Sequence, residues 1–175
     1  MRILITSTII LFLDQLTKFL VKSWMTIGES IPVLGNTVRF TFIYNYGMAF
    51  GISVNNKTLF TTISIFAAFI IIYYLFKMRN EKFIIKFPLA IILGGAVGNL
   101  FDRIVYGRVA DFMDVDIPDI FISAKKILFI NTPEIELQRW PIFNVADIAV
   151  TCGMFFLIFL ILFQKDNTET EPTDQ

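Results

Sequence analysis

Four stretches of this chain are long and apolar enough to cross a lipid bilayer, which takes about 20 mostly apolar residues in a helix. They cover residues 3–21, 58–76, 83–101 and 143–163. Hydrophobic residues make up 55% of the chain, and 20 of its 175 residues are phenylalanine, which exceeds the apolar content of a usual soluble domain. The sequence therefore predicts an α-helical integral membrane protein with four transmembrane helices.

The first stretch has a second interpretation, because a basic residue followed by an apolar run is also typical of a secretory signal. Here the run continues into Asp14 and Lys18, and no small-residue cleavage site follows it. We therefore expect a retained first helix. In the third stretch, "LGGAVGNLF" is compatible with a tight contact between helices, since glycine lets two backbones approach closely.

Basic residues in the short connections predict the orientation in the membrane. The connection between the second and third stretches holds Lys77, Arg79, Lys82 and Lys86 against one acid, Glu81. Such connections stay in the cytoplasm, so both termini are predicted to be cytoplasmic, with the longer connections 22–57 and 102–142 on the outer side. We expect residues 1–163 to form one membrane-embedded domain and residues 164–175 to form a disordered, polar cytoplasmic tail.

The outer connections also contain candidate strands. Residues 38–44 alternate between apolar and other side chains, and this period of two predicts a β-strand with one apolar face. Residues 119–140 mix apolar and charged residues without a clear period, so short strands and an interfacial helix are both open. We predict a small extracytoplasmic β-cradle beside the helices.

The composition limits the chemistry that this chain can perform. Histidine is absent and Cys152 is the one cysteine, which argues against histidine triads, Cys/His zinc sites and disulfides. Lysine plus arginine and aspartate plus glutamate number 15 each, so the basic excess of a nucleic-acid binder is missing. We predict no nucleic-acid partner, no metal and no cofactor. Chemistry must come from carboxylates, amides, hydroxyls, lysine or arginine.

Ionisable residues inside apolar stretches are costly, by about 2.5–3.5 kcal/mol each, and each one invites a functional hypothesis. Asp14 and Lys18 are four residues apart, on one helix face, and a structural ion pair is the favoured interpretation. Lys18 is also near enough to the outer end to extend toward water. Asn99 and Arg103 share a face in the same way, and the guanidinium of Arg103 suits a carboxylate or a peptide carbonyl.

Two further aspartates lie where the third helix ends and the fourth begins. Asp111 follows a predicted turn at Gly107, and Asp147 shares a helix face with Asn144. Because both positions fall at the outer boundary, the two carboxylates can meet, share one proton and activate water against an amide. Aspartates at helix starts also cap free N–H groups, and these residues alone favour capping or a structural role.

The remaining candidates have simpler interpretations. Asp102 is expected to pair with a basic group, and Asp114, Asp116 and Asp119 to lie on a solvated face. Cys152 is expected to be a buried packing residue.

Five motifs occur in the order that is typical of one family: "DQLTK", "NYGMAFG", "GGAVGNLFDR", "GRVADFMD" and "FNVAD". Over nearly its full length the chain resembles bacterial lipoprotein signal peptidase, or signal peptidase II. The resemblance implies an intramembrane aspartyl endopeptidase that cuts prolipoproteins just before a lipid-modified cysteine. We expect the protein in the bacterial cytoplasmic (inner) membrane, in contact with membrane lipid, with its active site at the outer face. We expect a monomer, although the sequence itself does not determine the oligomeric state.

Carried over by motif, the resemblance assigns catalysis to Asp111 and Asp147. The supporting residues it implies are Asp14, Lys18, Asn45, Gly47, Asn99, Arg103 and Asn144. Asparagine amides both donate and accept hydrogen bonds, so we also expect the three asparagines to bind the backbone of an unwound substrate. The segment between Asp114 and Phe143 is longer than the family pattern. The resemblance therefore does not predict how the outer loop closes over the site, while the two aspartates flank this segment.

Two other function classes are alternatives to the peptidase. A proton-coupled carrier would also use paired carboxylates, but it should show inverted repeats or broken helices, and the sequence shows neither. A non-catalytic scaffold would give no reason to place two aspartates at facing ends of consecutive helices. The peptidase is the preferred prediction.

Overall fold

The computed structural model describes residues 1–49, 52–53, 57–122, 126–127, 130–131 and 135–163. Its helices are α1 (Arg2–Trp24), α2 (Lys57–Lys77), α3 (Phe83–Tyr106) and α4 (Val145–Phe163). All four are long and apolar enough to cross a membrane, which confirms the predicted fold class. Helices α1 and α3 run on to Trp24 and Tyr106, past the predicted ends at 21 and 101. Gly107 ends α3 with a left-handed backbone (φ 73°), at the predicted turn.

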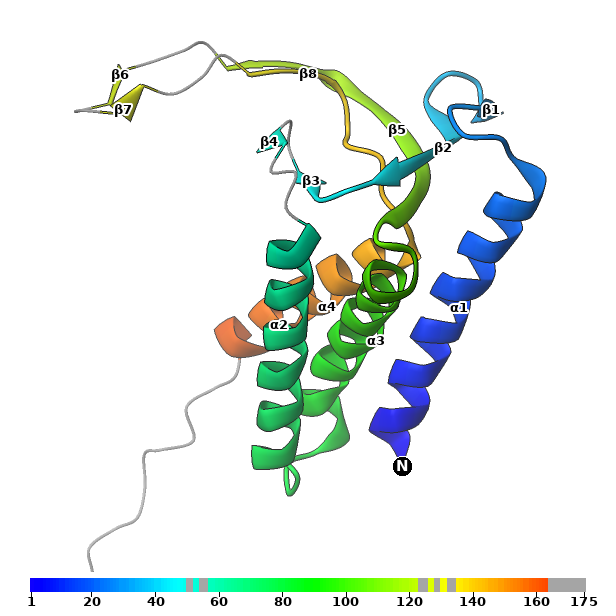
Figure 1. The fold of residues 1–175 in the computed structure, drawn as a ribbon. Coiled ribbons are helices and arrows are strands. Elements are labelled where there is room, and N and C mark those ends of the chain that lie inside the picture. Colours follow the sequence, from blue (N-terminus) through cyan, green and yellow to red (C-terminus); the bar gives the residue numbers. More distant parts are fainter. Residues whose placement is uncertain (50–51, 54–56, 123–125, 128–129, 132–134, 164–175) are drawn as a thin grey trace, which may run out of the picture.

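Helix α3 is the centre of the bundle and packs against each of the other three helices (Figure 1). Glycines make two of these contacts possible. A Cβ atom on Gly98 would lie 2.5 Å from the Asp14 carboxylate of α1, and one on Gly95 would lie 2.5 Å from the Ala146 carbonyl of α4. The tight helix contact predicted for the glycine-rich motif is therefore present on two sides of α3.

The outer surfaces of the helices are strongly apolar. Phe66 and Phe69 of α2 and Phe155 of α4 are each at least 66% exposed. A surface of this kind suits lipid and not water, as expected of a multi-pass membrane protein. Cys152 lies on this surface and is exposed, so the prediction that it is buried was wrong. Periodicity does not distinguish a lipid-facing position from a packed one when all sides of a helix are apolar.

An antiparallel sheet lies at one end of the bundle (Figure 1). Its strand order is β1-β2-β5-β8, with bounds Ser30–Leu34, Val38–Asn45, Val109–Ile122 and Ile135–Arg139. Two short pairs accompany it: β3 (Met48–Ala49) with β4 (Ile52–Ser53), and β6 (Lys126–Ile127) with β7 (Ile130–Asn131). The strand predicted over 38–44 is confirmed as β2. Within residues 119–140, the described residues form strands and no interfacial helix.

Strand β5 connects the sheet to the start of α4. It pairs with β2 in a register that places Asp111 opposite Ile43, beyond an irregularity between Phe40 and Ile43. The N–H groups of Phe112 and Met113 both donate to the Phe143 carbonyl, at 3.0 and 2.8 Å. These bonds place Asp111 beside the first turn of α4.

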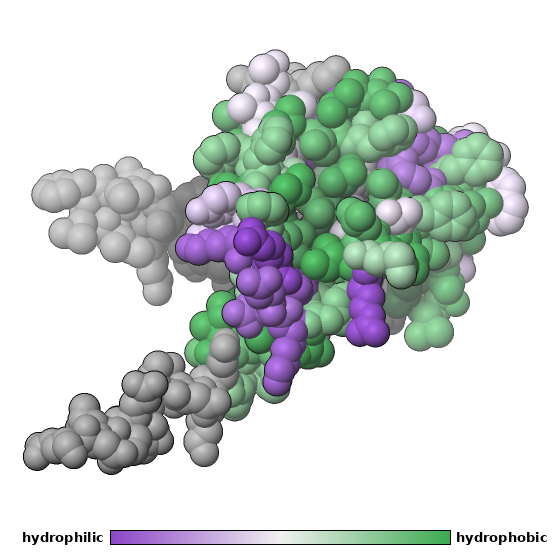
Figure 2. Space-filling model, turned by 90° about the horizontal axis from the view of Figure 1, so that it is seen from below, coloured by the Kyte–Doolittle hydropathy of each residue, from purple (hydrophilic) through white to green (hydrophobic). Residues whose placement is uncertain are grey.

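Different segments lie at the two ends of the bundle. The sheet covers one end, while the α2–α3 connection and the start of α1 lie at the other (Figure 1). Seen from that second end, hydrophilic residues gather over one part of an otherwise largely hydrophobic surface (Figure 2).

Candidate active site

Asn144 brings Asp111 and Asp147 together. Its side-chain Nδ2 donates to Asp111 Oδ1 at 2.6 Å, and its backbone N–H donates to Asp147 Oδ2 at 3.1 Å. Asn144 is fully buried, so packing on all sides holds this bridge in place. The structure therefore places the two aspartates about one shared residue, as the sequence predicted.

Asp147 also caps its helix. Its backbone N–H donates to Asn144 Oδ1 at 3.1 Å, while its carboxylate accepts the Asn144 N–H. This reciprocal arrangement is a capping box at the start of α4. The second carboxylate oxygen, Oδ1, accepts Asn99 Nδ2 at 2.8 Å. Capping is thus confirmed, but it does not compete with chemistry because a carboxylate oxygen has more than one lone pair.

The surroundings of Asp111 favour a bound proton. Its side chain is almost fully buried, at 1% exposure, and accepts Asn45 Nδ2 at 2.9 Å as well as Asn144. Burial is the main cause that raises the pKa of Asp111 from 3.8 to about 7, and the nearby negative charge of Asp147 is the second cause of the rise. The hydrogen bonds from Asn45 and Asn144 oppose the rise. Near pH 7 the carboxyl of Asp111 therefore exists in both protonation states.

Asp147 is the accessible member of the pair. Its side chain lines two cavities of about 310 and 280 Å³. The first is bounded by Trp140, Phe143 and the outer face of α4. The second lies between α2, α3 and α4 and includes Asn99 and Arg103. An extended peptide that passes from one cavity to the other would cross Asp147.

Arg103 faces the second cavity. Its Nη1 lies 3.4 Å from Ser64 Oγ and from the Asn99 carbonyl, and it forms no ion pair within the part of the chain that the structure describes. The sequence predicted a carboxylate or a peptide carbonyl as the partner of this guanidinium, and no carboxylate of the described residues is bound to it. A peptide carbonyl entering the cavity remains the other candidate partner.

Behind the aspartates lies a fully buried charge cluster. The Lys18 ammonium contacts Asp14 Oδ2 at 2.9 Å, Asp102 Oδ2 at 3.0 Å and Asn99 Oδ1 at 2.9 Å. The predicted Asp14–Lys18 ion pair is confirmed, and Asp102 pairs with a basic group as expected. Lys18 is 0% exposed, so the expectation that it extends toward water was wrong. Three buried acceptors from two helices hold the ammonium inside.

This cluster orients the amide of Asn99. Because Lys18 donates to Asn99 Oδ1, the Nδ2 group of the same amide is directed to Asp147. Asp14 contributes in a second way, since its Oδ1 accepts the Ala146 N–H of α4 at 3.0 Å. Negative charge at this place also suits the positive end of the α4 dipole.

Gln15 belongs to the same cluster, and sequence reasoning missed it. Its Nε2 lies 3.1 Å from Asp14 Oδ2, 3.3 Å from the Gly98 carbonyl and 3.4 Å from Asp102 Oδ1. A polar amide in an apolar helix, directly after Asp14, was the available signal.

Gly47 positions Asn45 through the backbone. Its N–H donates to Asn45 Oδ1 at 2.9 Å, which directs Asn45 Nδ2 to Asp111. The backbone is left-handed (φ 113°), and a Cβ atom would overlap the ring of Phe60. Only glycine fits this position without strain.

Asp114 was predicted to be solvated, and this was wrong. Its carboxylate is buried, at 6% exposure, and accepts Thr41 Oγ1 at 2.6 Å and Arg139 Nε at 2.7 Å. It thereby links β2, β5 and β8. Asp116 is exposed as expected, with Arg139 Nη1 at 3.6 Å. The side chain of Asp119 lies outside the described residues.

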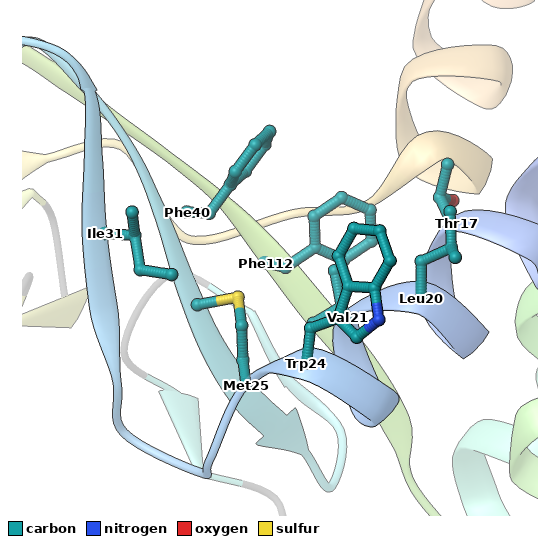
Figure 3. Close-up of a pocket in the computed structure, with 8 residues that line it drawn as sticks. All are labelled: Thr17, Leu20, Val21, Trp24, Met25, Ile31, Phe40 and Phe112. Carbon is teal, nitrogen blue, oxygen red and sulfur yellow. The ribbon is translucent and has the colours of Figure 1, made fainter.

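A separate apolar pocket of about 260 Å³ lies between the end of α1 and the sheet (Figure 3). Its lining includes Leu20, Trp24, Phe40 and Phe112, and none of the predicted site residues. It offers no ionisable side chain, in contrast to the two cavities at Asp147.

Comparison with known proteins identifies the family. The family model for signal peptidase (SPase) II matches residues 6–163. The lipoprotein signal peptidase of Syntrophus aciditrophicus (strain SB) is 38% identical over 171 residues, covering 94% of this chain and 95% of the relative. That of Pelotomaculum thermopropionicum (strain DSM 13744 / JCM 10971 / SI) is 34% identical over 168 residues, covering 96% of each.

Solved structures agree. A bacterial membrane enzyme solved by the in meso method at 2.3 Å resolution matches with a TM-score of 0.78 and 25% identity, covering 99% of this chain and 94% of that one. Another, solved at 1.9 Å, matches with a TM-score of 0.73 and 28% identity, covering 94% of each chain. The chain therefore belongs to the lipoprotein signal peptidase (signal peptidase II) family of membrane proteases, which process prolipoproteins.

Proposed function

We propose that this chain is an aspartic endopeptidase that removes the signal peptide from diacylglyceryl-modified prolipoproteins, cutting before the lipid-modified cysteine. The observation that carries the proposal is the bridging of Asp111 and Asp147 by Asn144, with Asp147 open to two cavities. A buried carboxyl beside an accessible carboxylate is the arrangement that water-activating aspartic hydrolases need.

The two aspartates divide the proton chemistry. Asp147 lies at the positive end of α4, which favours its ionised form, and it takes a proton from the attacking water. Asp111 holds its proton through burial, and that proton polarises the scissile carbonyl. When the tetrahedral intermediate collapses, the C–N bond breaks and the leaving nitrogen receives a proton from the two aspartates. Asp111 and Asp147 are then left sharing one proton, as at the start.

The substrate backbone is held by groups that face the second cavity. Asn99 and Arg103 line it and supply donors for peptide carbonyls that are released when the substrate helix unwinds. Asn144 was expected to share this role. Since it is fully buried and its amide contacts Asn99 and Asp111, we assign it to holding the dyad.

The placement in the cell follows from charge. The basic α2–α3 connection lies at the end opposite the sheet, and such segments stay in the cytoplasm. We place both termini in the cytoplasm and the dyad and sheet at the outer face of the bacterial inner membrane, with the protein acting as a monomer.

Cleavage of a diacylglyceryl-modified prolipoprotein peptide by purified protein in detergent tests the proposal. Asp111→Asn and Asp147→Asn should each lower turnover by about 10²–10⁴-fold, the usual contribution of a general acid or base. The exposed Asp116→Asn is the matched control and should keep turnover.

Thermal unfolding and substrate binding must be measured on the same samples, so that a misfolded variant is not scored as inactive. Substantial turnover by Asp147→Asn would reduce Asp147 to a helix cap. Absence of turnover by the wild-type protein would contradict the proposal and favour the carrier or scaffold interpretation.

A further inference from the structure

At the end of the bundle opposite the dyad, a cleft of about 320 Å³ opens between the starts of α1 and α3. Its lining residues are Met1, Arg2, Ile3, Phe83 and Lys86. Two of these five side chains are cationic, and none is acidic.

The two cations are held in place by the fold. The Arg2 guanidinium lies over the Phe83 ring, 5.9 Å from its centroid, at cation–π distance. Lys86 is only 9% exposed, and its Nζ donates to the Arg79 carbonyl at 2.8 Å. The fold therefore already restricts these long side chains, so that less conformational entropy is lost when a ligand binds.

The part of the chain that the structure describes does not neutralise the positive charge of the cleft. Among the described residues, neither Arg2 nor Lys86 forms an ion pair. The one acid of the α2–α3 connection, Glu81, does not line the cleft. Lys77, at the end of α2, and Arg79 and Lys82, in the α2–α3 connection, add positive charge to this end of the bundle. A buried ammonium without a counter-charge is costly, so an anion that entered the cleft would be stabilised.

The position of the cleft indicates which anion. It lies at the starts of two helices that are long and apolar enough to cross a membrane, and these helices carry exposed apolar side chains such as Ile5 and Ile84, which are 49% and 51% exposed. A phosphate that carries acyl chains satisfies both parts of this surface at once. The general preference for basic residues on one side of a membrane explains charge at this end, but it does not require a cleft that orders two cations.

We propose that this cleft binds the phosphate of an anionic phospholipid in the leaflet opposite the dyad, with its acyl chains along α1 and α3. Arg2 and Lys86 contact the phosphate directly. The site is separate from the peptidase chemistry and does not depend on it.

Native mass spectrometry of the full chain in detergent tests the site, with dioleoyl phosphatidylglycerol and dioleoyl phosphatidylcholine as probes. The anionic lipid should be retained at lower concentration than the zwitterionic one. Arg2→Gln should weaken phosphatidylglycerol binding about fivefold, the value of one basic residue at a lipid surface. Lys77→Gln is the matched control, because it removes the same charge at the same end but outside the cleft.

Lys77→Gln should weaken binding less than twofold, and Lys86→Gln should weaken it at least as much as Arg2→Gln. Should Lys86→Gln fail to fold, Arg2→Gln decides the question, since its side chain is near the surface. Equal retention of the two lipids would overturn the proposal. So would equal losses in Arg2→Gln and Lys77→Gln, which would show diffuse attraction only, or displacement of the lipid by an equal concentration of inorganic phosphate.

Discussion

The protein contains two pairs of aspartates that lie close together, and their surroundings differ. Asp14 and Asp102 share the ammonium of Lys18, and all three are completely buried. Among the described residues, Asp111 and Asp147 share the neutral amide and backbone of Asn144, and Asp147 opens to two cavities. Lys18 of the first pair donates to Asn99, and Asn99 donates to Asp147 of the second, so the two pairs belong to one hydrogen-bonded network.

The difference shows what separates a structural carboxylate from a reactive one. A lysine between two carboxylates offsets the repulsion between their negative charges. Neutral amides between two carboxylates leave that repulsion in place, which favours one shared proton. The first pair joins α1 to α3, and the second is the pair proposed for proton transfer. Four variants test this division.

Lys18→Met should have the largest effect on stability. It leaves Asp14 and Asp102 buried without a counter-charge, which typically costs about 3–5 kcal/mol. The free energy of unfolding in mixed micelles is the measurement, and Lys22→Met, one turn further along α1, is the control. A stable Lys18→Met protein would mean that the cluster does not hold the helices together.

Gly98→Ala should be the next largest. The new methyl group would lie 2.5 Å from the Asp14 carboxylate, which is fixed by Lys18 and by the Ala146 N–H. We expect a loss of about 1–3 kcal/mol in unfolding free energy, together with lower turnover. Ile104→Val, at a position of the same helix that is 61% exposed, is the control and should leave turnover unchanged. Unchanged stability of Gly98→Ala would show that α1 shifts freely against α3.

The pH dependence distinguishes the proton-sharing pair. The raised pKa of Asp111 means that the folded protein binds its proton more tightly than the unfolded chain does. The stabilisation from this proton is complete below pH 3.8 and is lost as the pH rises toward 7. Turnover that needs the proton should therefore fall as the pH rises above about 7.

Asn45→Ala should shift this limit to higher pH. The variant removes a hydrogen bond that lowers the pKa of Asp111, so the pKa should rise further, by up to about one pH unit. Thr41→Val, which changes the sheet away from the dyad, is the control. A shift to lower pH in Asn45→Ala would contradict the assignment of the proton to Asp111.

Asp147→Asn should have the smallest effect on stability, in contrast to its effect on turnover. An asparagine oxygen still accepts from Asn99, and the loss of one capping bond costs about 1 kcal/mol or less. Asp14→Asn should cost more, because it also breaks a buried ion pair. If Asp147→Asn unfolded the protein as readily as Asp14→Asn, the two pairs would not differ in role.

The elements of this fold were readable from local patterns. Apolar length predicted the four helices, and alternation over 38–44 predicted β2. Helix spacing also placed Asp14 with Lys18 and Asn144 with Asp147, because residues three or four apart share a face. The reciprocal cap between Asn144 and Asp147 is the same kind of local signal.

Contacts between elements were harder to predict. Nothing in the spacing along α1 reveals that Asp102 of α3 supplies the second carboxylate that keeps Lys18 inside. Asp114 resembles a loop residue until β2 and β8 bring Thr41 and Arg139 to it. Cys152 was expected to be buried and is exposed, because an apolar residue of a membrane helix can face lipid and need not pack inside the protein.

The donation from the Ala146 N–H to Asp14 has a consequence for biosynthesis. Asp14 is in α1, and Ala146 is in α4, which is synthesised later, only one residue before Asp147. The contact that fixes the start of α4 therefore cannot form until α4 has entered the bundle and met α1. In the proposed mechanism, a chain that is still being inserted has no working site, so neighbouring peptides in the membrane are not cut until assembly is complete.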